Sequence, residues 1–403
     1  MRPRAARESS IAPMRESPLP SATGPGDLTL GAVDVLPEGE LAERIAEGRP
    51  LRVKLGIDPT APDIHLGHVV VLEKLRQFQA AGHVAVLIIG DYTGRVGDPS
   101  GRSSLRPELT DEVIEANAAT FQEQAFKVLD PALTEVRFNS EWLDMPSAEL
   151  FALARRFTVA RLLERDDFTK RMAAAEPISL LELLYPVLQG YDSVAVEADL
   201  ELGGTDQKFN LLFGRDVQGS FGHRPQLVLT MPILPGTDGV KKMSKSLGNH
   251  VGVTEPATEI FGKLMSIPDE ALGTYWELLL GERLDPGRPP MEAKEELARR
   301  ICDRFAGPGA GAEGQAHFDR VHRDRAIPED LPEVALGDAD PVHLPALLRE
   351  AFAISGAEAR RMLSQGAVRL DGERLDGEPL DRPRADLEGR VLQVGKRRFA
   401  RLA

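Results

Sequence analysis

The stretch LRVKLGIDPTAPDIHLGHVVVLEKLRQFQAAGHVAVLIIGD, residues 51–91, decides the fold of this chain. Residues 51–58 alternate in polarity and end in an Asp-Pro turn, which predicts a strand. Apolar residues recur at helical spacing over 66–79, and the apolar run 84–91 has the length of a strand buried on both faces. Strand, helix and strand in this order predict a βαβ unit with a right-handed crossover.

The rest of the chain extends this pattern into several domains. Further helix is expected over 111–129 and 147–173, and QLVLTMPIL (226–234) is typical of another interior strand. We therefore predict a disordered extension over 1–30, followed by a Rossmann-like doubly wound α/β domain with a helical insertion over 31–255. A helical domain with a linker should follow over 256–330, and a linker with a basic module over 331–403. The last 60 residues carry a net charge of +3, against −17 for the remainder.

Composition narrows the class of protein. The chain has 403 residues, 42% of them hydrophobic and 28% charged, as in ordinary globular proteins, and its net charge of −14 argues against a protein that coats nucleic acid. Cys302 is the only cysteine, which excludes an intrachain disulfide and favours the cytoplasm. No apolar run is long enough for a membrane span. The first 26 residues favour a disordered tail, although a mitochondrial transit peptide stays open.

The segment HLGH places His65 and His68 three residues apart at the start of the predicted helix. Residues at this spacing share a helix face, and the free amides and positive dipole of a helix start favour phosphate. Gly67 would let a nucleotide approach the backbone. On this segment alone, capping or core histidines are an equal alternative, whereas a zinc site lacks further ligands.

A second segment, KKMSKSLGN (241–249), follows the strand 226–234. Its lysines, Lys242 and Lys245, lie in a predicted loop, where flexible ammonium groups could neutralise a developing pyrophosphate charge. A lysine-rich loop alone would be solvated surface. Its occurrence after HLGH makes the catalytic interpretation the better one.

Three further segments carry polar groups. YPVLQGYD places Tyr185, Gln189 and Asp192 on one helix face, which suits recognition of a small polar amino acid, although Pro186 makes the alignment approximate and an exposed amphipathic face is the alternative. ELGGTDQ (201–207) offers glycines for backbone approach and Asp206 for ribose hydroxyls. GDPSG (97–101) offers Asp98 for an ammonium group, unless it is only a turn.

Together these segments resemble the two signature sequences of class I aminoacyl-tRNA synthetases. From about residue 36 to its end, the chain resembles bacterial tyrosyl-tRNA synthetases most closely in VKLGIDPTAPDIHLGH, IIGDYTGRVGDPSGR, YPVLQGYDSVAVEADLELGGTDQKFN and KMSKS. The segment AEARRMLSQGAVRLDGE resembles the small α+β RNA-binding module that ends many bacterial members.

The resemblance implies a role for each candidate residue. ATP would be bound by His65, Gly67, His68, Lys242 and Lys245, and the adenylate ribose by Gly204 and Asp206. The tyrosine ammonium would be bound by Asp98, Tyr185 and Gln189, and the phenol by Asp192. Tyrosine would be activated to tyrosyl-adenylate and then transferred to tRNA(Tyr), with Mg²⁺ carried by ATP and no protein metal site. Basic candidates for tRNA are Arg360, Arg361, Arg369, Lys396, Arg397 and Arg398. A homodimer through helices between 111 and 180 is also implied.

One position departs from the family pattern. Where the better-known branch has a tyrosine that helps to grip the phenol, this chain has Lys54, which either pairs with a carboxylate or marks a different phenol site. Three alternatives stay open: the tryptophan-specific relative, a nucleotidyltransferase that uses HxGH without tRNA, and an RNA-binding protein on a retired synthetase scaffold.

Overall fold

The computed structural model describes residues 27–60, 62–100, 110–322, 331–337, 339–375, 379–395 and 398–403. Contacts between residues divide the chain into two compact units, with the division between Gly311 and Ala312. Most of the predicted N-terminal extension, residues 1–26, lies outside the described residues. Whether the first unit divides further into catalytic and helical domains near residue 255 stays a prediction.

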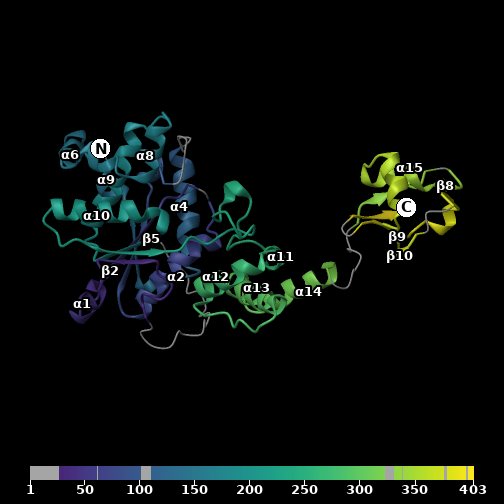
Figure 1. Ribbon diagram of the computed structural model, residues 1–403, viewed down its shortest axis with the longest axis horizontal. Helices are drawn as coiled ribbons and strands as arrows, with labels where there is room; N and C mark the ends of the chain where they lie inside the picture. The colour runs from purple at the N-terminus through teal and green to yellow at the C-terminus, as the bar shows by residue number, and fades with distance from the viewer. Residues whose placement is uncertain are drawn as a thin grey trace. The chain divides into compact units, whose positions relative to one another are not determined.

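The first unit is built on a six-stranded sheet with the order β1-β6-β5-β2-β3-β4 (Figure 1). Its strands are β1 (Asp34–Leu36), β2 (Arg52–Ile57), β3 (Val84–Ile89), β4 (Thr134–Phe138), β5 (Leu200–Gly204) and β6 (Leu227–Met231). All neighbours pair in parallel except the edge strand β1, which runs antiparallel to β6. The prediction of a doubly wound parallel sheet is confirmed.

The helices of this unit include those that cross over between its parallel strands. They are α1 (Glu40–Ala46), α2 (Leu66–Ala80), α3 (Thr93–Val96), α4 (Asp111–Ala125), α5 (Ser140–Leu143), α6 (Ser147–Ala154), α7 (Val159–Leu162), α8 (Asp166–Ala173), α9 (Leu180–Ala195), α10 (Lys208–Ser220), α11 (Ala257–Met265), α12 (Asp269–Leu280), α13 (Pro290–Ala306) and the start of α14 (Ala310–His322). Helix α2 joins β2 to β3 and α10 joins β5 to β6, so the chain winds outward in opposite directions from the β2–β5 pair. Right-handed crossovers in opposite directions put these helices on opposite faces of the sheet.

The helical prediction over 147–173 is only partly right, because the structure has three short helices there instead of one. Thr158 caps α7, accepting a hydrogen bond from the backbone of Arg161 at 3.3 Å. A hydroxyl at such a position starts a new helical segment, which the apolar periodicity does not register. The predicted strand 226–234 is shorter than expected and ends at Met231.

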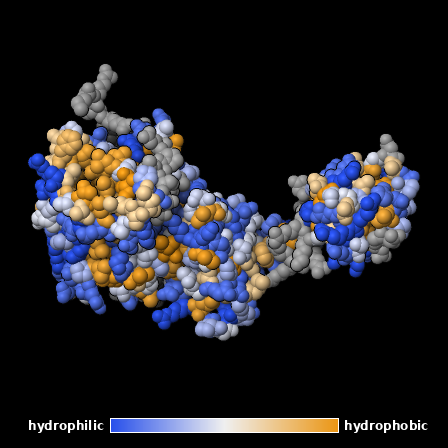
Figure 2. Space-filling view, turned by 45° about the horizontal axis from the view of Figure 1, so that its top comes forward, coloured by the Kyte–Doolittle hydropathy of each residue, from blue (hydrophilic) through white to orange (hydrophobic). Residues whose placement is uncertain are grey.

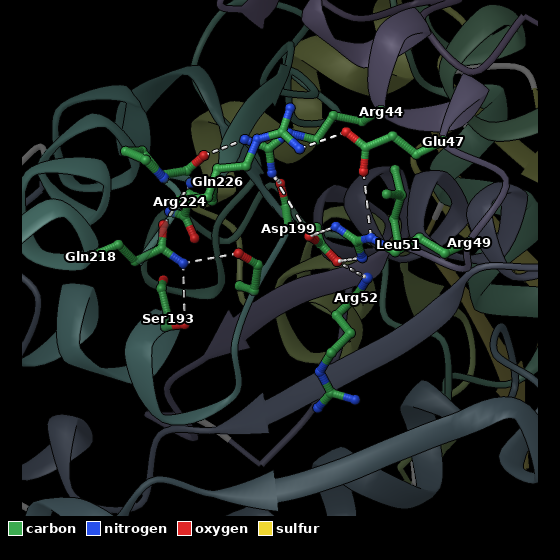
Figure 3. A network of polar contacts seen from close by, with 12 residues as sticks. Arg44, Glu47, Arg49, Leu51, Arg52, Ser193, Asp199, Gln218, Arg224 and Gln226 are labelled. Carbon is green, nitrogen blue, oxygen red and sulfur yellow. Dashed lines mark hydrogen bonds and ion pairs between the residues drawn. The ribbon is translucent and has the colours of Figure 1, made fainter. Parts of the chain in front are cut away.

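The amino ends and the carboxyl ends of the parallel strands differ in chemistry. At the amino ends of β2 and β5, Asp199 accepts bidentate hydrogen bonds from Arg49 at 2.6 and 2.7 Å and one from the backbone of Arg52 at 2.9 Å (Figure 3). The buried Arg44 of α1 donates to the carbonyl of Asp199 at 3.2 Å. A network of ion pairs and hydrogen bonds occupies the amino ends of these strands. Binding sites are therefore expected at their carboxyl ends, beside the point between β2 and β5 where the strand order reverses.

The second unit has its own sheet and core. Strands β7 (Glu333–Val334), β9 (Val368–Leu370), β10 (Glu373–Arg374), β12 (Val391–Val394) and β13 (Arg398–Leu402) form a sheet of order β10-β9-β12-β13-β7, and β8 (Val342–His343) pairs with β11 (Asp381–Arg382). Helices α15 (Leu344–Phe352) and α16 (Gly356–Ser364) supply Leu348 and Ala359 to a buried apolar cluster with strand residues such as Leu392. The predicted small α+β fold is confirmed.

A membrane span was not expected from the sequence. Within the described ranges, every helix is too short or too polar to cross a bilayer.

Candidate active site

Two adjoining pockets open at the carboxyl ends of the parallel strands. We call the first the strand-end pocket, which is lined by the ends of β2 and β5 and by α9, and the second the loop pocket, which is lined by the start of α2 and by the loop after β6. The strand-end pocket includes Asp58, Asp98, Tyr185, Gln189, Asp192, Glu201 and Gln207. The loop pocket includes Asp63, His65, Gly67, Lys242, Met243, Ser244 and Lys245. Thr60, His68, Val71, Gly204 and Asp206 line both.

Helix α9 brings three predicted residues to the strand-end pocket. Its start is fixed by a reciprocal capping box, in which Ser179 and Glu182 bond each other's backbone amides at 3.1 and 2.8 Å. Tyr185, Gln189 and Asp192 then share the face that lines the pocket. Pro186 lies inside the helix and does not start it, so the predicted alignment of the three polar groups holds.

Asp192 is the buried acid of this pocket. It accepts a hydrogen bond from the Trp142 indole at 2.8 Å and a long one from the Asn139 amide at 3.4 Å. Burial raises the pKa of Asp192 to about 7, even though Lys54 and these hydrogen bonds favour its ionised form. The carboxyl group can therefore exchange between acid and carboxylate near neutral pH.

Two further carboxylates of the strand-end pocket are those of Asp58 and Asp98. The Tyr185 hydroxyl donates to Asp58 at 2.8 Å, and Thr93 donates to its other oxygen at 2.7 Å. Asp98 accepts from Ser100 at 2.6 Å and from the Gln207 amide at 2.7 Å. Two carboxylates and a phenolic oxygen that line one pocket are acceptors suited to an ammonium group.

Gln189 carries an unsatisfied acceptor in this pocket. Its amide donates to Glu201 at 3.2 Å, which turns its oxygen the other way. That oxygen, Oε1, is buried and has no hydrogen-bond partner among the residues that the structure describes. A buried acceptor without a partner is costly, and a ligand donor would satisfy it.

Lys54 pairs with a carboxylate, the first of the two alternatives that its sequence position left open. Its ammonium group lies 2.8 Å from Glu201, on the neighbouring strand β5, and donates to Ser193 at 2.8 Å and to the carbonyl of Gln189 at 2.9 Å. Both charged side chains are fully buried. Lys54 lies behind the pocket wall, whereas Glu201 and Gln189 line the pocket.

The start of α2 supplies the histidines of the loop pocket. The backbone amide of His65 donates to Nδ1 of His68 at 3.3 Å, so Nε2 of His68 carries the ring hydrogen. Burial, and after it the neighbouring Lys245, lower the pKa of His68 to about 4; burial lowers the pKa of His65 as well. The rings are neutral at pH 7 and act as hydrogen-bond donors, not as charges. A Cβ on Gly67 would lie 3.0 Å from the His65 ring, so this close approach favours glycine.

The loop after β6 places the two predicted lysines. Asn249, which is almost fully buried, accepts from the backbone of Ser244 at 2.9 Å and donates to Asp238 at 2.8 Å and to the carbonyl of Lys242 at 3.2 Å. These bonds fix the loop backbone. Lys242 lies 3.7 Å from Asp206, and Lys245 contacts Asp63 across the loop pocket.

The boundary between the two pockets is formed by predicted residues. His68, Gly204 and Asp206 line both, so groups bound in the two pockets would meet there. Burial raises the pKa of Asp206, and Lys242 opposes this shift. A Cβ on Gly204 would lie 2.7 Å from an Asp206 oxygen, so glycine leaves that carboxylate in place.

The predicted tRNA-binding residues belong to the second unit. Arg360 and Arg361 are exposed on α16, Arg398 is exposed on β13, and Arg369 on β9 is partly buried and donates to the carbonyl of Gly372 at 2.9 Å. Lys396 and Arg397 lie outside the described residues. Arg374, opposite Arg369 in the β9–β10 pairing, is a further basic residue that the sequence analysis did not single out.

Sequence reasoning missed several residues that line the strand-end pocket, chiefly Asp58, Asn139, Glu201 and Gln207, and it missed Trp142, which bonds Asp192. Asp58 ends a predicted parallel strand, and its place at the carboxyl edge could have marked it. Asn139 and Trp142 reach Asp192 from about 50 residues earlier in the chain, and the sequence contains no signal for that contact.

Comparison with known proteins finds similarity to aminoacyl-tRNA synthetases over most of the chain. Residues 46–298 match the family described as tRNA synthetases class I (W and Y). A tyrosine–tRNA ligase of Moorella thermoacetica is 51% identical over 93% of this chain and 94% of its own, and one of Bordetella pertussis is 52% identical over 92% and 94%.

Solved structures share the fold at low sequence identity. A C-terminally truncated mitochondrial tyrosyl-tRNA synthetase of Aspergillus nidulans superimposes with a TM-score of 0.60 at 21% identity, covering 73% of this chain and 91% of that one. The tyrosyl-tRNA synthetase of Archaeoglobus fulgidus, solved with L-tyrosine, gives 0.57 at 22% identity, covering 71% and 96%.

Proposed function

The chain belongs to the class I tRNA synthetases, among the tyrosine–tRNA ligases, and we propose that its two adjoining pockets bind L-tyrosine and ATP side by side. The observation that carries this assignment is the shared boundary at His68, Gly204 and Asp206. The strand-end pocket offers acids for an ammonium group and a phenol, and the loop pocket offers donors and lysines for phosphates.

Tyrosine fits the strand-end pocket in one orientation. Its ammonium group would lie between Asp98, Tyr185 and the free oxygen of Gln189, with Asp58 behind Tyr185. Its phenol would reach Asp192, the buried acid held by Trp142 and Asn139. Phenylalanine has no hydroxyl to donate to the buried Asp192, and the loss of that bond is the physical basis on which tyrosyl-tRNA synthetases reject phenylalanine without editing.

ATP fits the loop pocket with its phosphates at the start of α2. Nε2 of His68 would donate to phosphate oxygens, as would His65, the positive end of the α2 dipole would favour them, and Gly67 would admit the nucleotide. Asp206 and Gly204 would hold the ribose. Lys242 and Lys245 would pair with the β- and γ-phosphates.

The reaction then proceeds where the pockets meet. A tyrosine carboxylate oxygen attacks the α-phosphorus, the bond from that phosphorus to the bridging oxygen breaks, and pyrophosphate leaves with the charge that the two lysines neutralise. The terminal ribose hydroxyl of tRNA next attacks the activated carbonyl and releases AMP. The protein contributes position and charge, and no covalent enzyme intermediate is needed.

Mg²⁺ would accompany ATP on its phosphate oxygens and add to charge neutralisation there. Among the residues that the structure describes, no group of three or more His, Cys, Asp or Glu side chains could hold a metal ion. The carboxylates that line the loop pocket, Asp63 and Asp206, each have a lysine partner. This donor set suits an ion that arrives with the nucleotide.

We assign tRNA contacts to the basic residues of the second unit, Arg360, Arg361, Arg369 and Arg398, with Lys396 and Arg397. Their side chains would contact phosphates, so affinity for tRNA should fall as salt rises, and each lost contact should flatten that dependence. We also propose that the protein works in the cytoplasm, since its single cysteine fits a reducing compartment.

A homodimer is proposed from an exposed apolar surface on helices α6 to α9. Its members are large apolar side chains that are more than half exposed, namely Phe151, Val159, Met172, Leu180 and Leu181. Apolar side chains gather over this part of the first unit (Figure 2). A patch of this kind favours self-association. Light scattering should give a dimer, and Leu180→Glu with Phe151→Glu should give a monomer; a monomeric unmodified protein would refute the proposal.

The assignment of substrates is tested by exchange of labelled pyrophosphate into ATP. We expect exchange with tyrosine and none with phenylalanine or tryptophan. Exchange with tryptophan alone would assign the strand-end pocket to the other amino acid of the family. No exchange with any amino acid would contradict the catalytic assignment and favour an RNA-binding role.

A further inference from the structure

The loop pocket contains an acidic residue that the proposed reaction does not use. Asp63 lies between β2 and α2 and lines the pocket that we assign to the phosphates of ATP. A carboxylate repels phosphate, so its presence there needs a reason. The reason lies in its partner, because Asp63 contacts the ammonium group of Lys245.

Asp63 is held in place by helix α4. The backbone amide of Ile64 donates to the side-chain oxygen of Gln124 at 2.7 Å, and the amide of Gln124 donates to the carbonyl of Pro62 at 2.9 Å. Thr120 donates to the same carbonyl at 2.8 Å. The backbone on both sides of Asp63 is therefore fixed to α4, and the carboxylate has a defined position.

Lys245 is held by a backbone that is fixed independently. Asn249 bonds the backbone of Ser244, next to Lys245, and Lys245 itself begins a short 3₁₀ turn that ends at Leu247. Its side chain, about one-quarter exposed, bridges the pocket to Asp63. The two anchors are separate in the chain, so a rotation of the lysine side chain alone can exchange one partner for another.

From this geometry we infer that Asp63 is a positioning residue that holds Lys245 in the empty loop pocket and gives it up to the phosphates of ATP. The inference rests on the proposed function of this pocket. Without nucleotide, Asp63 keeps the lysine within reach of the phosphate position and neutralises its charge. With nucleotide, the more highly charged phosphate takes the lysine, and the lost ion pair lowers the net affinity for ATP.

The central test is the variant Asp63→Asn, which keeps the shape and removes the charge. A partly exposed ion pair has a modest strength, so the dissociation constant for ATP should fall about two- to fivefold. The KM for ATP in tyrosine-dependent exchange should fall by the same factor, with a smaller change in kcat and an unchanged KM for tyrosine. Asp63→Glu retains the charge and should keep the affinity for ATP close to that of the unmodified protein.

A double-variant cycle shows whether Asp63 acts through Lys245. We would measure ATP binding by titration calorimetry in the unmodified protein, Asp63→Asn, Lys245→Met and the double variant, since binding can be measured after activity is lost. The effect of Asp63→Asn should disappear in the Lys245→Met background. Asp269→Asn is the matched control, because it removes a partly exposed acid paired with Lys294 outside both pockets, and it should leave ATP binding unchanged.

Two outcomes would overturn the inference. Weaker or unchanged ATP binding in Asp63→Asn would mean that Asp63 assists the nucleotide or is idle. Persistence of the effect in the Lys245→Met background would mean that Asp63 only repels phosphate. The unmodified protein separates this inference from the proposed function, since tyrosine-dependent exchange by that protein would support the latter whatever the variants do.

Discussion

Asp192 combines burial with a pKa near neutrality, and this predicts a pH dependence of tyrosine binding. The ionised carboxylate is the stronger acceptor for the phenol hydrogen, and its raised pKa, about 7, means that it is lost as pH falls below that value. The KM for tyrosine should therefore rise as the pH is lowered from 8 to 6. In Asp192→Asn the KM should be higher than in the unmodified protein and nearly flat over that range. An unchanged pH profile in the variant would contradict the assigned role.

The pair of Lys54 and Glu201 predicts a second effect at the level of single residues. Removing one member of a buried ion pair leaves an uncompensated charge, so Lys54→Met should lower the free energy of unfolding by about 3–5 kcal/mol. Urea denaturation should show this loss, and the double variant Lys54→Met with Glu201→Gln should recover much of it. No recovery in the double variant would show that packing of Lys54, and not its charge, matters.

At this scale the sequence predicted the residues with unusual chemistry but not their partners. Asp192, Asp206, His68 and Lys242 stand out in short segments. The partner of Lys54 depends on the register of β2 against β5, which pairs residues almost 150 positions apart and leaves no local pattern. The roles assigned to these residues stay predictions until variants are tested.

Among the elements, helix α1 and the sheet are joined by the network around Asp199 (Figure 3). Burial would raise the pKa of Asp199, but hydrogen bonds from Arg49 and Arg52 outweigh it and lower the pKa. The contribution of the ionised Asp199 to the free energy of unfolding is therefore complete above the pKa of about 3.9 that an aspartate has in the unfolded chain. This contribution is lost as pH falls through the lower pKa that Asp199 has in the folded protein. Asp199→Asn should lower the unfolding free energy by about 1–3 kcal/mol near pH 7.

The difference in unfolding free energy between the unmodified protein and Asp199→Asn tests this account of the network. Thermal unfolding of both from pH 7 to pH 2 should bring their stabilities together as the carboxylate is protonated. A constant difference over the whole range would mean that the ion pairs contribute nothing and that the substitution acts through packing.

Prediction of the elements followed the strength of their periodicity. The βαβ unit over 51–91 was found because its strands are apolar and its helix is long and regular. The segment 147–173 was harder, since its helices are as short as four residues and exposed apolar residues such as Phe151 blur their periodicity. Those exposed side chains are the ones that we assign to a dimer.

For the whole molecule, the two units predict separable functions. Each has a buried apolar core, and both pockets lie in the first unit. A chain that ends after residue 322 should retain tyrosine-dependent pyrophosphate exchange and lose at least tenfold in kcat/KM for tRNA charging. Charging by this truncated chain at the full rate would contradict the assignment of tRNA contacts to the second unit, and loss of exchange would contradict the independence of the first.

The central claim is that tyrosine and ATP occupy adjoining pockets that meet at His68, Gly204 and Asp206. A crystal structure with a non-hydrolysable tyrosyl-adenylate analogue tests it most directly. We predict the phenol at Asp192, the ammonium group at Asp98, Tyr185 and Gln189, and the ribose at Gly204 and Asp206, with Lys54 still paired to Glu201. An analogue bound elsewhere, or with its phenol away from Asp192, would contradict the account.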